Sequence, residues 1–425
     1  MEFYEIRGGN RLFGECEAGI AKNAALPILA AALMADEYIE IQVPMMSDIK
    51  YMAEILGIIG CGVEIAGGLC RIDPTTANCH VMPERLSKLI RSSIFMMGPM
   101  LAKFSQAEFT YPGGCEIGLR PIDLHLRGLR ELGAKITEDN GRIHCSGALK
   151  GAVVHFDYPS VGATENIMMA ATLAQGETVI ENAAMEPEIV DLANFLSMMG
   201  AKISGAGTRR IRIRGVKKLH GGHYRPMTDR IIVGTLLAAA AATGGDIRVT
   251  DAFPGDLEAV LAKLRQMGCI LDSHGKGIGI ISPLRLKAFR TLETMPYPGF
   301  PTDMQTQFLA LQSMAEGAGA ITENIFENRF ATASELVKMG ADIVVKDRSA
   351  FVRGVERLHG ADVEAKDLRG GVALVIAGLA AQGVTTVRDI HYVDRGYDRF
   401  EETLKELGAD IERLECDAWD CARVY

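Results

Sequence analysis

A single cysteine stands in the most unusual segment of the chain, the run from Tyr111 to Pro121. Three glycines and two prolines bracket Cys115 in these eleven residues, a composition typical of a loop rather than of a helix or a strand. Arg120 follows five residues later, and a nearby cation lowers the pKa of a thiol. Although a lone cysteine is more often inert packing, no apolar periodicity surrounds this one. The segment therefore predicts a lid-like loop that displays a reactive thiol.

Ionisable and polar residues also stand at the start of long apolar segments. They are Lys22-Asn23, Arg91-Ser92, Thr164-Glu165, Asp229-Arg230, Asp303 and Arg369. A helix start presents free N–H groups and a partial positive charge, so it favours anions. At any one position, ordinary capping or a solvated end charge is the simpler interpretation. Because Lys22, Arg91, Arg230 and Arg369 place cations where the helix dipole disfavours them, the set as a whole favours an anion-binding cleft.

A repeated phrase indicates which elements position these residues. Leucine, two residues, an apolar residue, and glycine followed by alanine or cysteine recur every 67 to 73 residues, with the glycine at Gly60, Gly133, Gly200, Gly268, Gly340 and Gly408. The phrase is typical of an amphipathic helix that ends at a glycine and is followed by a strand. Such regular spacing indicates six copies of one structural unit.

Each unit also contains an apolar segment with almost no polar face, such as 23–35 or 230–243. A helix that is apolar on all sides is buried. Each unit is therefore predicted as helix, strand, helix, strand, with sheets outside and apolar helices inside. Six units divide into two three-repeat α/β domains, expected at 22–228 and at 1–21 with 229–425. The glycine-rich stretch 219–226 is the expected hinge.

The composition excludes several classes of protein. A chain of 425 residues with 48% hydrophobic and 23% charged residues is globular and suits two or three domains. No apolar run approaches the ~20 residues that span a bilayer, and the acidic N-terminus is unlike a secretory signal. A net charge of -9 argues against a general nucleic-acid binder.

The cysteines favour a reducing cytoplasm. Their number, nine, is odd, and no C-x-x-C occurs. The eight besides Cys115 are expected in strands, helices or the tail, as structural residues. His220-Gly-Gly-His223 is a two-ligand pattern without a partner pair, and a polar turn is its simpler interpretation.

Six motifs, in order, carry a family resemblance. They are Ala21-Lys-Asn-Ala-Ala-Leu-Pro27, Pro112-Gly-Gly-Cys-Glu-Ile-Gly118, Arg120-Pro-Ile-Asp-Leu-His125, Phe300-Pro-Thr-Asp-Met-Gln305, Phe326-Glu-Asn-Arg-Phe330 and Asp394-Arg-Gly-Tyr397. Through them the chain, up to about Leu414, resembles the UDP-N-acetylglucosamine 1-carboxyvinyltransferases of the enolpyruvyl transferase family. The resemblance implies two inside-out α/β-barrel domains of three repeats each, with the active site in the cleft between them.

The resemblance also implies a reaction. The 3′-hydroxyl of UDP-N-acetylglucosamine attacks C2 of phosphoenolpyruvate, a proton adds at C3, and phosphate leaves from a tetrahedral intermediate. This is the first committed step of peptidoglycan precursor synthesis, in the cytoplasm. No cofactor, metal, nucleic acid, membrane or obligate protein partner is expected.

Roles follow for individual residues by the same resemblance. Lys22, Arg120 and Arg395 hold the phosphate and carboxylate of phosphoenolpyruvate, with Arg369 nearby. Cys115 is the proton donor and the site of a covalent phospholactoyl adduct, and Asp303 is the base at the sugar hydroxyl. The nucleotide sugar contacts Asn23, Arg91, Arg120, Pro121, Ile122, Asp123, Leu124, Ser160, Val161, Gly162, Ala163 and Ile325. Arg230 and Arg329 complete the predicted substrate-binding set.

Two other functions stay open. The 3-phosphoshikimate 1-carboxyvinyltransferases have the same fold but lack the Pro-Gly-Gly-Cys loop and have a different lysine-serine motif near their start. A non-catalytic binding protein is expected to lose Cys115, Asp303 or the arginines, and all are present. The departures from the family pattern, at Gly19-Ile20, at Gly370 and in the tail 416–425, remove no residue with a predicted chemical role.

Overall fold

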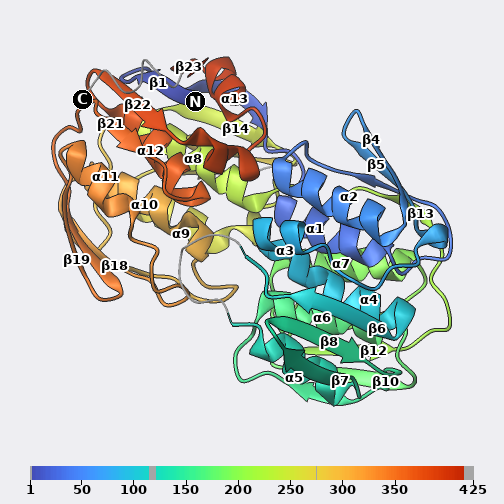
Figure 1. The fold of residues 1–425 in the computed structure, drawn as a ribbon. Coiled ribbons are helices and arrows are strands. Elements are labelled where there is room, and N and C mark those ends of the chain that lie inside the picture. The colour runs from blue at the N-terminus through green and yellow to red at the C-terminus, as the bar shows by residue number, and fades with distance from the viewer. Residues whose placement is uncertain (1, 114–120, 274, 416–425) are drawn as a thin grey trace. The chain divides into compact units, whose positions relative to one another are not determined.

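The computed structural model describes residues 2–113, 121–273 and 275–415. Within these residues the chain divides into two compact units (Figure 1). The N-terminal unit contains residues 20–113 and 121–227, and the C-terminal unit contains residues 2–19 and 228–415. Each unit contains three copies of one arrangement of helices and strands. Cys115, Arg120 and the tail from 416 lie outside the described residues.

One series of helices is buried along most of its length. It comprises α1 (Lys22–Ala32), α4 (Met97–Phe104), α6 (Val161–Ala171), α8 (Arg230–Thr243), α10 (Gln305–Ser313) and α12 (Leu368–Ala380). In α8, every residue from Ile231 to Ala241 is buried. Alanine and glycine allow close approach, and α8, α10 and α12 pack against one another inside the C-terminal unit. The prediction of buried apolar helices is confirmed.

A second series of helices is amphipathic. It comprises α2 (Ser47–Ile59), α5 (Asp123–Glu131), α7 (Pro187–Met198), α9 (Glu258–Gln266), α11 (Thr332–Lys338) and α13 (Phe400–Glu406). The glycine predicted to end each of them has a left-handed backbone, with φ between 93° and 104°. Glycine adopts this conformation without steric cost, which is why it recurs at the helix end. The sixfold repeat is therefore confirmed.

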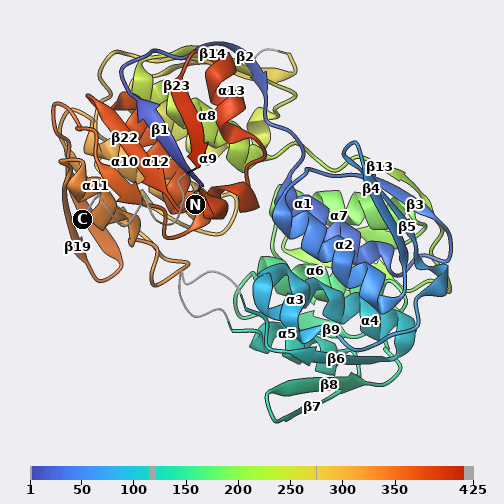
Figure 2. The same ribbon diagram turned by 45° about the horizontal axis from the view of Figure 1, so that its top comes forward.

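Three sheets belong to the N-terminal unit. Their strand orders are β13-β3-β5-β4 (Gly222–Tyr224, Ile39–Gln42, Leu69–Asp73, Gly62–Ala66), β6-β8-β7 (Gln106–Thr110, Arg142–Ser146, Lys135–Asp139) and β11-β12-β10-β9 (Lys202–Ser204, Arg210–Arg214, Glu177–Glu181, Val153–His155). Figure 2 shows β6, β8 and β7 along the outside of this unit. In β12, Ile211 and Ile213 are buried and the alternating arginines are exposed, as expected of a sheet with one face on the core.

Three further sheets belong to the C-terminal unit. Their strand orders are β15-β16-β14-β2 (Ile270–Asp272, Gly277–Ile281, Asp246–Thr250, Phe13–Glu17), β17-β18-β20-β19 (Thr291–Glu293, Ala318–Thr322, Ser349–Arg353, Asp342–Lys346) and β21-β22-β1-β23 (Asp362–Glu364, Val384–Arg388, Glu2–Arg7, Asp410–Glu415). Short helical segments complete the fold: α3 (Glu84–Leu89), η1 (Pro74–Thr76), η2 (Arg91–Met96), η3 (Pro254–Asp256), η4 (Thr302–Met304) and η5 (Ile390–Arg395). No helix among the described residues is long and apolar enough to cross a bilayer.

The structure differs from the predicted repeat in its number of strands. The strand after each amphipathic helix pairs with a further antiparallel strand, which is β5, β8, β12, β16 or β20. In the last repeat the N-terminal strand β1 takes this place, because Tyr4 pairs with both Val387 and Arg413. These strands are five or six residues long and lie outside the repeated glycine phrase, so the period of the repeat did not reveal them.

Two local predictions were wrong. The sequence His220-Gly-Gly-His223, expected as a polar turn, runs into β13, in which Gly222 and Tyr224 pair with Ile39 and Ile41 of β3. The helix expected to start at Thr164-Glu165 begins earlier, at Val161, because the Ser160 hydroxyl accepts a hydrogen bond from the N–H of Ala163 (3.4 Å) and caps it.

Candidate active site

The C-terminal unit brings three of the predicted residues into direct contact. Asp303 lies in η4, immediately before the buried helix α10. Arg329 Nη2 donates to Asp303 Oδ1 at 2.9 Å, and Arg369 Nη2 donates to Asp303 Oδ2 at 2.8 Å. The arginine side chains are only 2% and 5% exposed, whereas that of Asp303 is 26% exposed. The carboxylate is therefore the solvent-facing member of a cluster with two buried cations.

The arginines determine the charge of this carboxyl group. Burial raises the pKa of Asp303, but the charges of Arg369 and Arg329 outweigh this effect and hold the pKa well below its usual range. Asp303 is thus ionised at neutral pH and, while both arginines hold it, is a weak base. A change in either ion pair would change its basicity.

A buried polar network fixes Arg369. Its Nη1 donates to Tyr397 Oη at 3.0 Å, and that oxygen shares a 2.8 Å hydrogen bond with Thr235 Oγ1. Gln307 Nε2 donates to Thr235 Oγ1 at 3.3 Å and to the carbonyl oxygen of Asp303 at 2.9 Å. Side chains from α8, α10 and the segment after η5 therefore determine where the Arg369 guanidinium lies. No role was predicted for Tyr397, Thr235 or Gln307.

The other predicted residues of this unit lie at the ends of elements. Arg230 begins α8, with its guanidinium 5.8 Å from the centre of the Tyr297 ring. Arg395 ends η5 and is half-buried. Its neighbour Asp394 is ion-paired with Arg413 of β23. Ile325 is half-buried in the turn after β18.

In the N-terminal unit, Lys22 is buried at the start of α1. Its Nζ lies 3.3 Å from Oδ2 of Asp48, a buried carboxylate in the first turn of α2. Asn23, the next residue, is exposed. Arg91 begins η2 and donates from Nη1 to the carbonyl oxygen of Pro112 at 3.4 Å. Arg91 therefore contacts the chain close to the start of the segment that carries Cys115.

A buried asparagine connects three predicted segments of this unit. Asn166 Oδ1 accepts from the N–H of Gly98 at 2.8 Å, and Nδ2 donates to the carbonyl oxygen of Ile94 at 3.0 Å. Asn166 Nδ2 also lies 2.9 Å from His125 Nδ1. Because the amide nitrogen can only donate, His125 Nδ1 accepts, and the ring proton is inferred on Nε2. A Cβ added to Gly162 would lie 3.1 Å from the His125 ring, so a larger residue there would press against this ring.

These contacts bring two predicted groups of nucleotide-sugar residues together at the starts of α5 and α6. In the first group Pro121 and Asp123 are exposed, Leu124 is half-buried and Ile122 is buried; in the second Ser160, Val161 and Gly162 are half-buried and Ala163 is buried. Asn166 and His125 were not predicted as site residues. His125 ends a motif that was recognised, but nothing in the sequence marks the partner of a single buried asparagine.

The sequence profile of the EPSP synthase family (3-phosphoshikimate 1-carboxyvinyltransferase) matches residues 6–404. The chain belongs to this family of enolpyruvyl transferases. A UDP-N-acetylglucosamine 1-carboxyvinyltransferase 2 from Caldanaerobacter subterraneus subsp. tengcongensis is 51% identical over 97% of this chain and 100% of that protein. A UDP-N-acetylglucosamine 1-carboxyvinyltransferase from Pectobacterium atrosepticum is 50% identical over 98% and 99%.

Solved structures of enolpyruvyl transferases have the same fold. The enolpyruvyl transferase NikO from Streptomyces tendae has a TM-score of 0.88 at 24% identity, over 98% of this chain and 99% of that one. EPSP synthase from Acinetobacter baumannii has a TM-score of 0.76 at 20% identity, over 98% and 100%. At these identities the likeness concerns the fold alone, and it confirms the predicted fold class.

Burial keeps most described cysteines of this enolpyruvyl transferase in the thiol form, which is the less reactive form. Burial raises the pKa of Cys16, Cys70 and Cys145 to about 12 and that of Cys61 and Cys269 to about 11. The expectation that all the others lie in helices, strands or the tail was wrong for Cys79, which is half-buried between η1 and α3. Cys61 and Cys269 likewise lie between a helix-ending glycine and the next strand.

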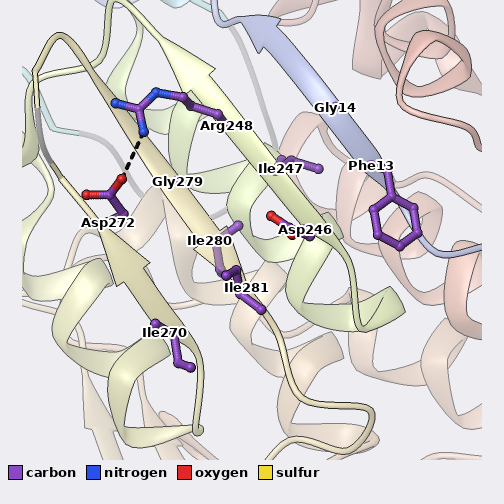
Figure 3. A pocket seen from close by; sticks show the side chains of 10 residues that line it. All are labelled: Phe13, Gly14, Asp246, Ile247, Arg248, Ile270, Asp272, Gly279, Ile280 and Ile281. Carbon is purple, nitrogen blue, oxygen red and sulfur yellow. Dashed lines mark hydrogen bonds and ion pairs between the residues drawn. The ribbon is translucent and has the colours of Figure 1, made fainter.

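A pocket of the enolpyruvyl transferase lies on the sheet β15-β16-β14-β2 and contains none of the predicted site residues (Figure 3). Its exposed apolar side chains include Phe13, Ile270 and Ile281. Figure 3 shows an ion pair in this pocket between Arg248 and Asp272, with an N–O distance of 3.2 Å. Within the described part of the chain, no group of three or more His, Cys, Asp or Glu residues could hold a metal ion.

Proposed function

We propose that this enolpyruvyl transferase transfers the enolpyruvyl group of phosphoenolpyruvate to the 3′-hydroxyl of UDP-N-acetylglucosamine, as the first committed step of peptidoglycan precursor synthesis. One observation carries the proposal: Asp303 is an ionised carboxylate held between Arg329 and Arg369. The cluster offers both a proton acceptor and cations for an anionic substrate. Relatives of about half-identical sequence, named for this reaction, support the same choice of acceptor.

The ion pair gives Asp303 a substrate-dependent basicity. In the proposal, Lys22, Arg120 and Arg395 bind the phosphate and carboxylate of phosphoenolpyruvate, with Arg369 nearby. An anion that recruits Arg369 competes with Asp303 for its Nη2. As that ion pair weakens, the pKa of Asp303 rises toward its ordinary value, and the carboxylate becomes a better base when the co-substrate is bound.

The proposed chemistry is an addition followed by an elimination. The sugar 3′-oxygen forms a bond to C2 as its proton passes to Asp303, and Cys115 delivers a proton to C3. The C2–O bond to phosphate then breaks as C3 returns a proton to the Cys115 thiolate, and the proton held by Asp303 leaves with the phosphate. The products are the enol ether and inorganic phosphate. Attack by the Cys115 thiolate at C2, with a proton added at C3, gives the proposed phospholactoyl adduct.

The nucleotide sugar is proposed to contact residues of both units. Asn23, Arg91 and the helix starts at 121–124 and 160–163 are its partners from the N-terminal unit, with Arg120. Ile325, Arg230 and Arg329 are its partners from the C-terminal unit. We also propose a cytoplasmic location, which the free thiols of the described cysteines support.

The acceptor is tested by mass spectrometry of the product. The protein is incubated with phosphoenolpyruvate and either UDP-N-acetylglucosamine or shikimate 3-phosphate. Enolpyruvyl-UDP-N-acetylglucosamine alone is the expected product. Transfer to shikimate 3-phosphate, the acceptor in the name of the matching family profile, would overturn the proposal, as would the absence of any product.

A further inference from the structure

Glu323 is a buried carboxylate to which the predicted chemistry assigns no role. It follows β18 and is 1% exposed. Its Oε1 accepts from Thr294 Oγ1 at 2.8 Å and from the N–H groups of Ile325 (2.8 Å) and Phe326 (3.1 Å). Its Oε2 accepts from Thr302 Oγ1 at 2.9 Å. A buried carboxylate with four donors is fully engaged and holds its donors in one geometry.

These bonds connect the turns that carry two of the predicted site residues. Strands β17 and β18 run parallel, with Glu293 opposite Thr322. The segments that follow the two strands therefore leave the sheet at the same end. Thr302 directly precedes Asp303, and the Ile325 N–H belongs to the turn that presents the Ile325 side chain. One oxygen of Glu323 therefore holds the Asp303 turn, and the other holds the Ile325 turn.

Arg329 closes the connection from the other end of the same segment. Its Nη2 donates to Asp303 Oδ1, at 2.9 Å. Segment 323–329 is therefore attached to residues 302–303 twice, through Glu323 at its start and Arg329 at its end. A displacement of the Asp303 turn would require one of these attachments to break.

We propose that Glu323 is a positioning residue, which fixes the predicted base Asp303 and the predicted sugar contact Ile325 relative to each other. It acts through Thr302 and the backbone of the Ile325 turn, without touching substrate. The inference rests on the proposed function and deepens it. It predicts that the alignment of the nucleotide sugar depends on Glu323, whereas the binding of phosphoenolpyruvate does not.

The variant Glu323→Gln tests this with little change of volume. The amide oxygen can still accept the three donors at the Oε1 position, but without the negative charge that strengthens these bonds. The NH₂ group reverses the bond at the Oε2 position, so the Thr302 hydroxyl has to turn and accept. We expect kcat/KM for UDP-N-acetylglucosamine to fall about ten- to hundredfold, the scale for a misplacement of about 1 Å. The KM for phosphoenolpyruvate should stay within about twofold of its wild-type value.

Glu335→Gln is the matched control. Glu335 is 2% exposed in the same unit and accepts from Lys338 Nζ, Lys366 Nζ and the Glu364 N–H. It contacts no predicted site residue through these bonds. This variant and the Glu323 variant should both lower the midpoint of thermal unfolding, but with Glu335→Gln the kinetic constants for both substrates should stay within about twofold.

Thr302→Val removes the same contact from the other side and is usable even if Glu323→Gln fails to fold. If Glu323 acts through Thr302, the single variants and the double variant lose kcat/KM to a similar extent. Unchanged kcat/KM for the sugar in either single variant, or losses that multiply in the double variant, would overturn the positioning role. The wild-type protein in the same assay separates the positioning role of Glu323 from the proposed function. If the wild type shows no turnover, the proposed function itself is refuted.

Discussion

Replacing Asp303 by asparagine should separate turnover from binding. The amide keeps the size of the side chain and one acceptor oxygen, but it carries no negative charge and does not take up a proton at neutral pH. In the structure each carboxylate oxygen accepts from one arginine, at 2.9 and 2.8 Å. Asp303→Asn therefore removes a charge that two buried guanidinium groups share, together with the proposed base.

The expected magnitudes differ for stability and for rate. Removing one partner of a buried ion pair costs about 3–5 kcal/mol, and the partial exposure of Asp303 favours the lower end, about 3 kcal/mol. A total stability of roughly 5–15 kcal/mol leaves such a variant folded. Loss of a positioned base typically costs about 10²–10⁴-fold in rate, so kcat should fall by that factor.

The assay combines urea unfolding, calorimetric binding of UDP-N-acetylglucosamine and steady-state turnover. The dissociation constant of the sugar should change by less than about tenfold, which is 1.4 kcal/mol. Asp362→Asn is the control, because Asp362 also accepts two bonds from one arginine, Arg388, at 2.7 and 2.6 Å, but has no predicted role. Its kcat should equal that of the wild type.

Two results would refute this reasoning. Wild-type turnover in Asp303→Asn would remove Asp303 from the mechanism. A fall in kcat/KM that comes from a loss of sugar affinity alone would show that the residue contributes binding rather than proton transfer.

Three further predictions concern Cys115, Asp303 and Asn166. Sub-stoichiometric alkylation followed by peptide mapping should find the label on Cys115 first, and label mainly on another cysteine would contradict this. Cys115→Ser should lose most product formation. Cys115→Asp should keep some product formation while resisting alkylation. Because its folded pKa is lowered, Asp303 stabilises the protein above its unfolded pKa of about 3.9 and loses this effect as the pH falls toward the folded value; the gap in unfolding free energy between wild type and Asp303→Asn should be constant from about pH 8 to pH 5 and shrink below about pH 4, and a gap that widens in acid would contradict it. Asn166→Ala leaves the N–H of Gly98 buried without an acceptor, so urea unfolding should show that the free energy of unfolding falls by about 1–3 kcal/mol. The KM for the nucleotide sugar should also rise more than the KM for phosphoenolpyruvate. Equal KM values in variant and wild type would contradict the connecting role of Asn166.

The repeat was predictable because its signals are local. Gly133 ends a helix with a left-handed backbone, which glycine adopts most easily, and the apolar run 231–241 is buried because it has no polar face. The strand β13 was not predictable, because Gly221 and Gly222 favour a turn locally and only pairing with β3 makes residues 222–224 a strand.

The candidate site was predictable as a set of residue types but not as a set of contacts. Asp303, Arg329 and Arg369 could be named from the sequence, yet the double ion pair that lowers the pKa of Asp303 depends on three separate elements meeting. Asn166 and Glu323 carry no periodicity and no motif of their own. Their roles follow from tertiary hydrogen bonds that connect segments far apart in the sequence.

The most direct test of the proposed transfer is phosphate release from phosphoenolpyruvate, measured with and without UDP-N-acetylglucosamine. The account predicts that inorganic phosphate appears only when the nucleotide sugar is present, in equal amount to the enolpyruvyl product. Phosphate released at the same rate without the sugar, or with shikimate 3-phosphate in its place, would contradict it.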